Sequence, residues 1–182
     1  MATTKWILDP VHSELGFRIK HLMITNLSGS FNSFQVEATT TDDDFSTGAI
    51  AVTVDMSSIN TNNQQRDAHL RNSDFFEVDK HPELKFTSSK IVKEDDDTFV
   101  LHGELTLKGI SNPVKLDVEY NGITKDPWGS ERAGFSVSGK IKRSDWGVSF
   151  NGPLETGGMI LGEEVKILAE IQLVKEAVAA AV

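Results

Sequence analysis

Cysteine is absent from the 182-residue chain, which excludes disulfides, thiolate nucleophiles and cysteine metal sites together. Long apolar runs are missing too, since no window approaches the roughly 18 apolar residues that a membrane-spanning helix needs. Residues 1–8 also lack the basic stretch and long apolar segment of a signal peptide. We therefore expect no transmembrane segment and a cytoplasmic location, or a periplasmic one if a native signal peptide has been removed.

Positive charge is scarce. The chain has 18 Lys and Arg against 27 Asp and Glu, giving a net charge of −9. Such a surface repels nucleic-acid phosphates, so nucleic acid is not an expected partner. It repels anionic lipid headgroups for the same reason. Net charge puts no limit on an apolar ligand, because it does not describe the protein interior.

Catalytic and metal-binding motifs are absent as well. The five histidines show no HExxH spacing and no pair two residues apart on one strand. There is no G-x-S-x-G motif and no glycine loop with a lysine placed to bind phosphate. The acidic runs at 42–44 and 94–97 are expected at solvated hairpin tips. The sequence therefore predicts no catalytic residue, no bound metal and no cofactor.

Alternation of apolar and polar residues is the dominant pattern. In residues 13–20, Leu15, Phe17 and Ile19 share one face of the predicted strand. Sheets with one solvent-exposed face and one buried face are antiparallel. A sheet of this size either folds onto another sheet or closes into a barrel. Further strands are predicted at 49–56, 98–108, 114–120, 135–143 and 165–173, and weaker ones at 5–8, 30–39 and 84–93. Turns are predicted at 41–44, 94–97, 121–122 and 126–129.

The segment 57–76 has no alternation. Asn62 or Asn63 is placed to cap a short helix that runs through about His69–Asn72. The segment ends in Phe75 and Phe76. One interpretation is a lid or plug at a barrel end, and the other is a surface crossover whose phenylalanines add to the core.

Two glycines fall on apolar strand faces. Gly103 lies between Leu101 and Leu105, and Gly139 lies between Val137 and Ile141. A missing side chain on an inward face would leave volume inside a barrel, and barrels of about eight strands are just wide enough for one small ligand. The alternative is that these glycines permit bends or bulges.

Taken together, the local motifs resemble the YceI-like family, the lipocalin-like polyisoprenoid-binding proteins, from Trp6 to about Lys175. The longer motifs are WILDPVHS at 6–13, RDAHLRNSDFF at 66–76, GELTLKG at 103–109, DPWG at 126–129, RAGF at 132–135 and RSDWG at 143–147. The shorter ones are His21, GSF at 29–31, HP at 81–82, Phe86, PV at 113–114 and Asn151.

The resemblance implies an all-β, eight-stranded antiparallel, lipocalin-like barrel with a short helical excursion around residues 60–74. Residues 1–176 would form this single domain, and 177–182 a C-terminal tail. The family also implies an elongated apolar cavity that holds a polyisoprenoid, a quinone or another long lipid-like chain. A homodimer would fit the family as well.

Strand parity then selects candidate ligand-binding residues. The candidate walls of the cavity are Phe17, Ile19, Phe31, Phe34, Phe86, Leu101, Leu105, Phe135, Val137 and Ile141, with Gly103 and Gly139 supplying room. The candidate mouth is Arg66, His69, Phe75 and Phe76. Two alternatives to ligand binding remain: an enzyme that acts on an isoprenoid or quinone headgroup near His69, Asp67 or Arg66, and a non-binding interaction module whose barrel is filled by side chains.

Overall fold

The computed structural model describes residues 2–155 and 157–176, so the expected tail 177–182 lies outside the described residues. The strands are β1 (Thr3–Leu8), β2 (Glu14–His21), β3 (Thr25–Phe31), β4 (Phe34–Thr41), β5 (Asp44–Asp55), β6 (Ile59–Asn60), β7 (Glu83–Lys93), β8 (Thr98–Leu107), β9 (Ile110–Lys125), β10 (Glu131–Lys142) and β11 (Leu161–Lys175). Helix α1 spans Gln64–Arg71, and short 3-10 turns lie at Pro10–His12, Met56–Ser58 and Arg143–Trp146.

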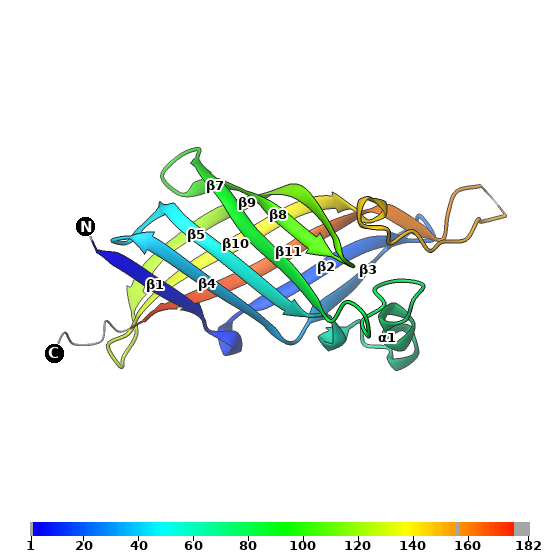
Figure 1. Ribbon diagram of the computed structural model, residues 1–182, viewed down its shortest axis with the longest axis horizontal. Coiled ribbons are helices and arrows are strands. Elements are labelled where there is room, and N and C mark those ends of the chain that lie inside the picture. The colour runs from blue at the N-terminus through cyan, green and yellow to red at the C-terminus, as the bar shows by residue number, and fades with distance from the viewer. Residues whose placement is uncertain (1, 156, 177–182) are drawn as a thin grey trace.

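The sheet closes on itself. Strand β1 pairs with β4 on one side and with β11 on the other, so the order β1-β4-β5-β7-β8-β9-β10-β11 forms a ring. Every pairing is antiparallel, which confirms the predicted eight-stranded antiparallel barrel (Figure 1). Beyond β1, the long strand β11 pairs with β2, and β3 and β6 follow in order. This branch lengthens one end of the barrel.

Local signals in the sequence match most of these elements, but β6 and the part of β3 before residue 30 were not predicted, and two further differences have a clear physical reason. The strand expected at 30–39 is interrupted at residues 32–33, where β3 ends and β4 begins. The turn predicted at 121–122 is wrong, because both residues lie inside β9. Gly122 has φ +103°, and the register with β10 shifts between Gly134 and Phe135. A glycine in a left-handed conformation also serves a β-bulge, so Asn-Gly here bends a strand without ending it.

One end of the barrel is filled by a cluster of aromatic side chains. The Trp6 side chain is 0% exposed, and its ring centroid lies 5.0 Å from that of Phe45. Phe45 in turn lies 4.8 Å from Phe135 and 5.6 Å from Tyr120. The Trp6 indole N–H donates to Thr40 Oγ1 at 3.2 Å, so the only polar group of this ring has a partner.

An ion-pair cluster joins three of the sequence motifs. The Arg132 guanidinium donates to Asp126 Oδ2 at 2.7 Å and also to Asp9 Oδ2. Hydrogen bonds from Arg132 and from the Ser130 backbone hold the pKa of Asp126 below its usual value. At Asp9 burial would raise the pKa, but hydrogen bonds with His12 and Arg132 outweigh it and the pKa is lowered. The cluster ties Asp9, which follows β1, to β10 and to the β9–β10 loop, so it is structural.

We expect acid to weaken this cluster. A carboxyl group whose pKa is lowered in the folded state stabilises the fold above its unfolded pKa of about 4, and this contribution is lost as the pH falls through the folded pKa. The melting temperature should therefore drop below about pH 4. Arg132→Gln should melt lower than wild type near pH 7 and show a smaller further drop in acid, measured by circular dichroism. Parallel pH profiles for the two proteins would contradict the assignment.

Candidate functional site

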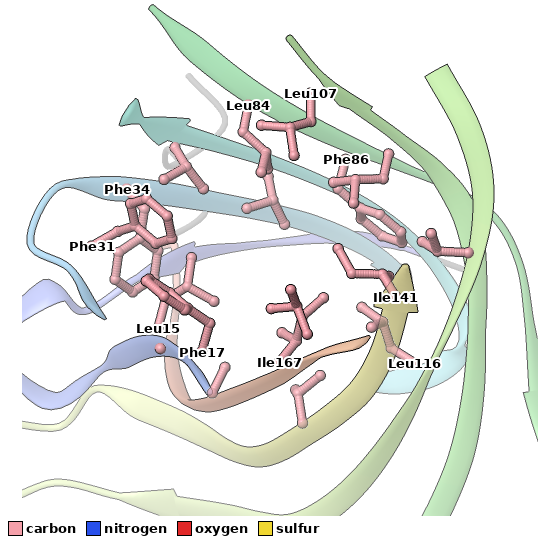
Figure 2. Close-up of a pocket in the computed structure, with 18 of the residues that line it drawn as sticks. Leu15, Phe17, Phe31, Phe34, Leu84, Phe86, Leu107, Leu116, Ile141 and Ile167 are labelled. Carbon is pink, nitrogen blue, oxygen red and sulfur yellow. The ribbon is translucent and has the colours of Figure 1, made fainter. Parts of the chain in front are cut away.

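The barrel encloses a cavity of about 530 Å³ (Figure 2). Its wall is made of inward-pointing apolar side chains from nearly all strands. Many of these side chains are only half-buried although they line the cavity, and Leu15, Phe17, Phe31 and Phe34 also line a second, more polar cleft. Examples are Leu15, Phe17, Phe31, Phe34, Ile50, Val52, Leu84, Leu116, Ile141 and Ile167. The volume falls within the range of about 300–1,000 Å³ typical of ligand sites.

The cavity is closed at one end and open at the other. Phe45 and Phe135 of the aromatic cluster line its floor. Among the lining residues that the structure describes, only Phe150 and Ile160 are exposed to solvent. Both belong to the segment that precedes β11, at the end of the barrel that also carries α1 (Figure 1). The cavity therefore has an opening at this end.

Polar side chains reach the cavity at only a few points. Within the described part of the chain, the lining contains no Asp or Glu, and its basic side chains are His21, Arg66, His69 and Arg143. Arg66 and His69 come from α1, and Arg143 from the 3-10 turn after β10. A polar group on a ligand would therefore meet hydrogen-bond donors here and no carboxylate.

Helix α1 is held in place by a network around Thr61. Asn63, one of the two predicted caps, begins the helix, and its side chain accepts the Arg66 backbone N–H at 2.9 Å. The buried Asp67 carboxylate accepts the Thr61 backbone N–H at 2.9 Å and also the Thr61 hydroxyl. The Arg66 side chain donates to Thr61 Oγ1 and to its carbonyl, at 2.8 and 2.6 Å. Asp67 thus orients the helix, and it does not line the cavity.

Three rings connect α1 to the segment before β11. The ring centroid of His69 lies 5.0 Å from Phe75 and 5.1 Å from Phe150, and those two phenylalanines are 5.1 Å apart. His69 Nε2 lies 2.9 Å from Asp74 Oδ2. Phe75 and Phe76 both line the cavity and also pack in the core cluster that contains Phe86, so the structure is consistent with both interpretations of this segment.

Arg143 holds the backbone next to the opening. The side chain is only 5% exposed and donates at 2.9 Å to the carbonyl oxygens of Gly162, Val148 and Phe150. Burial lowers its pKa, and the negative charge of Glu163 opposes this effect. Arg143 thus positions Phe150 at the cavity end.

Every predicted site residue except the two glycines lines the cavity: Phe17, Ile19, Phe31, Phe34, Arg66, His69, Phe75, Phe76, Phe86, Leu101, Leu105, Phe135, Val137 and Ile141. Their contact with a ligand stays a prediction. Sequence reasoning missed His21, Arg143, Phe150 and Ile160. The RSDWG motif was a signal for Arg143, but nothing local marked Phe150 or Ile160 as the opening.

The role predicted for the two glycines is wrong. A β-carbon on Gly103 would lie 2.5 Å from the Phe86 ring and 2.5 Å from the Thr87 carbonyl oxygen. A β-carbon on Gly139 would lie 2.6 Å from a Leu116 methyl group. Neighbouring side chains already fill both spaces, so these glycines allow close packing and add no room for a ligand. Gly103 also pairs with Ser88, next to a register shift in β7, as the alternative expected.

No helix in residues 2–155 or 157–176 is long and apolar enough to cross a bilayer. In the same residues no three His, Asp or Glu side chains come together as metal ligands. Neither finding identifies a ligand for the cavity.

Comparisons with known proteins agree with this architecture. Residues 6–173 match the family model of the YceI-like domain. A UPF0312 protein of Staphylococcus aureus (strain N315) is 41% identical over 170 residues, which cover 93% of this chain and 96% of that protein. The Campylobacter jejuni YCEI protein is 34% identical with a TM-score of 0.75, covering 93% of this chain and 97% of that one. A polyisoprenoid binding domain from Saccharophagus degradans is 14% identical with a TM-score of 0.68, covering 94% and 98%, and shows the fold alone.

Proposed function

Since the chain belongs to the YceI-like family, we propose that it binds a long apolar molecule inside the barrel, for storage, sequestration or transport. The candidate ligands are an isoprenoid, a quinone or a similar lipid-like chain. The observation that carries the proposal is the cavity of about 530 Å³ walled by inward apolar side chains. The polyisoprenoid binding domain with the same fold is consistent with it.

The physical basis is the hydrophobic effect. Burial of apolar surface contributes about 25 cal/mol per Å² and needs no directional contact. Tail length should therefore determine affinity more than tail identity. The donors of Arg66 and His69 near the opening would favour a headgroup with hydrogen-bond acceptors.

Binding without conversion fits the polar residues better than catalysis. Asp67 accepts two hydrogen bonds from Thr61, and His69 lies beside Asp74, so both are held by neighbouring groups of the protein. The alternative of an interaction module required a barrel filled by side chains, which the cavity argues against. Product formation that depends on His69 would overturn the binding proposal.

Filling the cavity should abolish binding. Ile167 faces the cavity from β11 and is half-buried, so Ile167→Trp would place an indole ring in the space for the ligand (Figure 2). We expect at least about a tenfold loss of affinity for a fluorescent polyene fatty acid, because the displaced contacts are apolar and extensive. Fluorescence titration of delipidated protein measures this affinity.

Lys166→Trp is the matched control. Lys166 is adjacent in β11, is exposed and does not line the cavity. Its variant should bind the probe like wild type. Equal affinity in all three proteins would show that the probe binds elsewhere. Native mass spectrometry of protein purified from its own host would then identify the natural ligand by mass.

A further inference from the structure

An exposed apolar surface borders the opening of the cavity. Two segments form it: the turn between β2 and β3, and the segment that precedes β11. We call these residues the apolar rim: Leu22, Met23, Ile24, Phe150, Met159 and Ile160. Phe150 and Ile160 also line the cavity, so the rim is continuous with the interior.

The two segments of the rim are in contact. The Leu22 backbone N–H donates to the Ile160 carbonyl oxygen at 2.8 Å. The Met23 sulfur occupies the space where a side chain on Gly158 would lie. The rim is therefore one surface, and its two segments lie at the end of the barrel that also carries α1 (Figure 1).

The β2–β3 turn has an unusual sequence for its conformation. The Ile24 N–H closes the turn on the His21 carbonyl oxygen at 3.2 Å, and the two central residues, Leu22 and Met23, have φ of +53° and +63°. Turns with two positive φ angles favour Asn-Gly or Asp-Gly, because bulky side chains are unfavourable there. Here they hold large apolar side chains instead, and the next residue, Ile24, is 78% exposed. Such an outlier is typical of functional surfaces.

The two segments of the rim contain few charged residues. Residues 22–24 contain no charged side chain, and within 147–162 the only charged residue is Glu155. The acidic runs at 42–44 and 94–97 lie at hairpin tips of the opposite end (Figure 1). Contact of the six rim residues with an apolar phase would bury no charge of their own, and the acidic runs at 42–44 and 94–97 would stay in water.

We propose that the apolar rim inserts into the surface of a lipid bilayer and holds the opening of the cavity against it. The proposal rests on the proposed function, because a bilayer is where a long apolar ligand resides. With the rim in the bilayer, the ligand tail could pass between membrane and barrel without crossing water. The interaction depends on apolar side chains, so it should not require anionic lipids.

A single fluorescent label tests which end of the barrel meets the membrane. The chain has no cysteine, so Ile24→Cys can be labelled uniquely with an environment-sensitive nitrobenzoxadiazole dye. With phosphatidylcholine vesicles, its emission should shift to the blue and increase severalfold. The control is Trp128→Cys, at an 85% exposed apolar residue of the β9–β10 loop, whose label should not respond. No response at Ile24, or equal responses at both positions, would overturn the proposal.

Ile24→Asp tests the contribution of the rim itself. It places a charge where the bilayer would lie, and Ile24 neither lines the cavity nor is buried, so the fold should be retained. Sedimentation with phosphatidylcholine vesicles should show at least about a tenfold lower partition than wild type, and Trp128→Asp should partition like wild type. Unchanged partition of Ile24→Asp would contradict the proposal.

Two further readouts separate the alternatives. Ile24→Asp should still bind the polyene fatty acid in vesicle-free solution. Vesicle binding without any binding of this probe would support membrane contact and overturn the proposed function. Probe binding without vesicle binding would support the proposed function and overturn the membrane contact. If the rim instead covers a second copy of the chain, wild type would sediment as a dimer in analytical ultracentrifugation, Ile24→Asp as a monomer, and neither would bind vesicles.

Discussion

Trp6→Ala should destabilise the barrel by about 3–5 kcal/mol, the usual range for removing a fully buried tryptophan. The ring is 0% exposed and packs against Phe45 beneath the cavity floor. The lost stability has two parts. One is the favourable free energy of burying the indole ring, and the other is the cost of the void that the surrounding β-sheet fills only in part. Urea unfolding followed by circular dichroism measures the free energy of unfolding.

The same variant should also deepen the cavity. Phe45 and Phe135 line the floor, and Trp6 supports Phe45 from behind. Native mass spectrometry should find longer apolar chains bound to Trp6→Ala than to wild type. Trp128→Ala is the control: this side chain is exposed, so stability should stay within about 0.5 kcal/mol of wild type. Equal losses in the two variants would refute a special role for the aromatic cluster.

Gly103→Ala should destabilise the protein by about 1–3 kcal/mol, although alanine usually stabilises a strand relative to glycine. The added β-carbon would meet the Phe86 ring and the Thr87 carbonyl oxygen at 2.5 Å each. The ring can shift, but the carbonyl belongs to the paired strand β7, so the backbone must move. Urea unfolding again provides the measurement.

Gly134→Ala is the matched control for this prediction. A β-carbon there would meet only the Asn121 β-carbon, at an ordinary 3.7 Å. The loss of unfolded-chain entropy should then stabilise the protein by about 0.4–1 kcal/mol. A loss of stability in Gly103→Ala together with a gain in Gly134→Ala would confirm that close packing requires a glycine at position 103. A gain in stability at both positions would show that the Phe86 contact is easily relieved.

The sequence alone determined which residues face inward. Alternation in 13–20 placed Leu15, Phe17 and Ile19 on one face, and all three line the cavity. It also narrowed the cap of α1 to Asn62 or Asn63, of which the structure has Asn63. These features are local, because strand parity and helix capping depend on residues close together in the chain.

The Asn-Gly pair at 121–122 is a place where the local sequence does not decide the structure. Asn-Gly suits a hairpin turn and a bulge equally well, and the pairing of β9 with β10 decides between them. The same holds for Gly103 and Gly139, which face inward as expected. Whether an inward glycine leaves a void depends on side chains of the neighbouring strand, here Phe86 and Leu116.

What the sequence by itself determined is therefore an antiparallel barrel with a specified apolar interior. Only the tertiary structure decided that the interior is hollow, that the aromatic cluster around Trp6 closes one end, and that Phe150 and Ile160 mark the opening. Periodicity reports the direction of each side chain. The volume left inside depends on how side chains from strands far apart in the sequence meet across the barrel, and no local pattern contains that information.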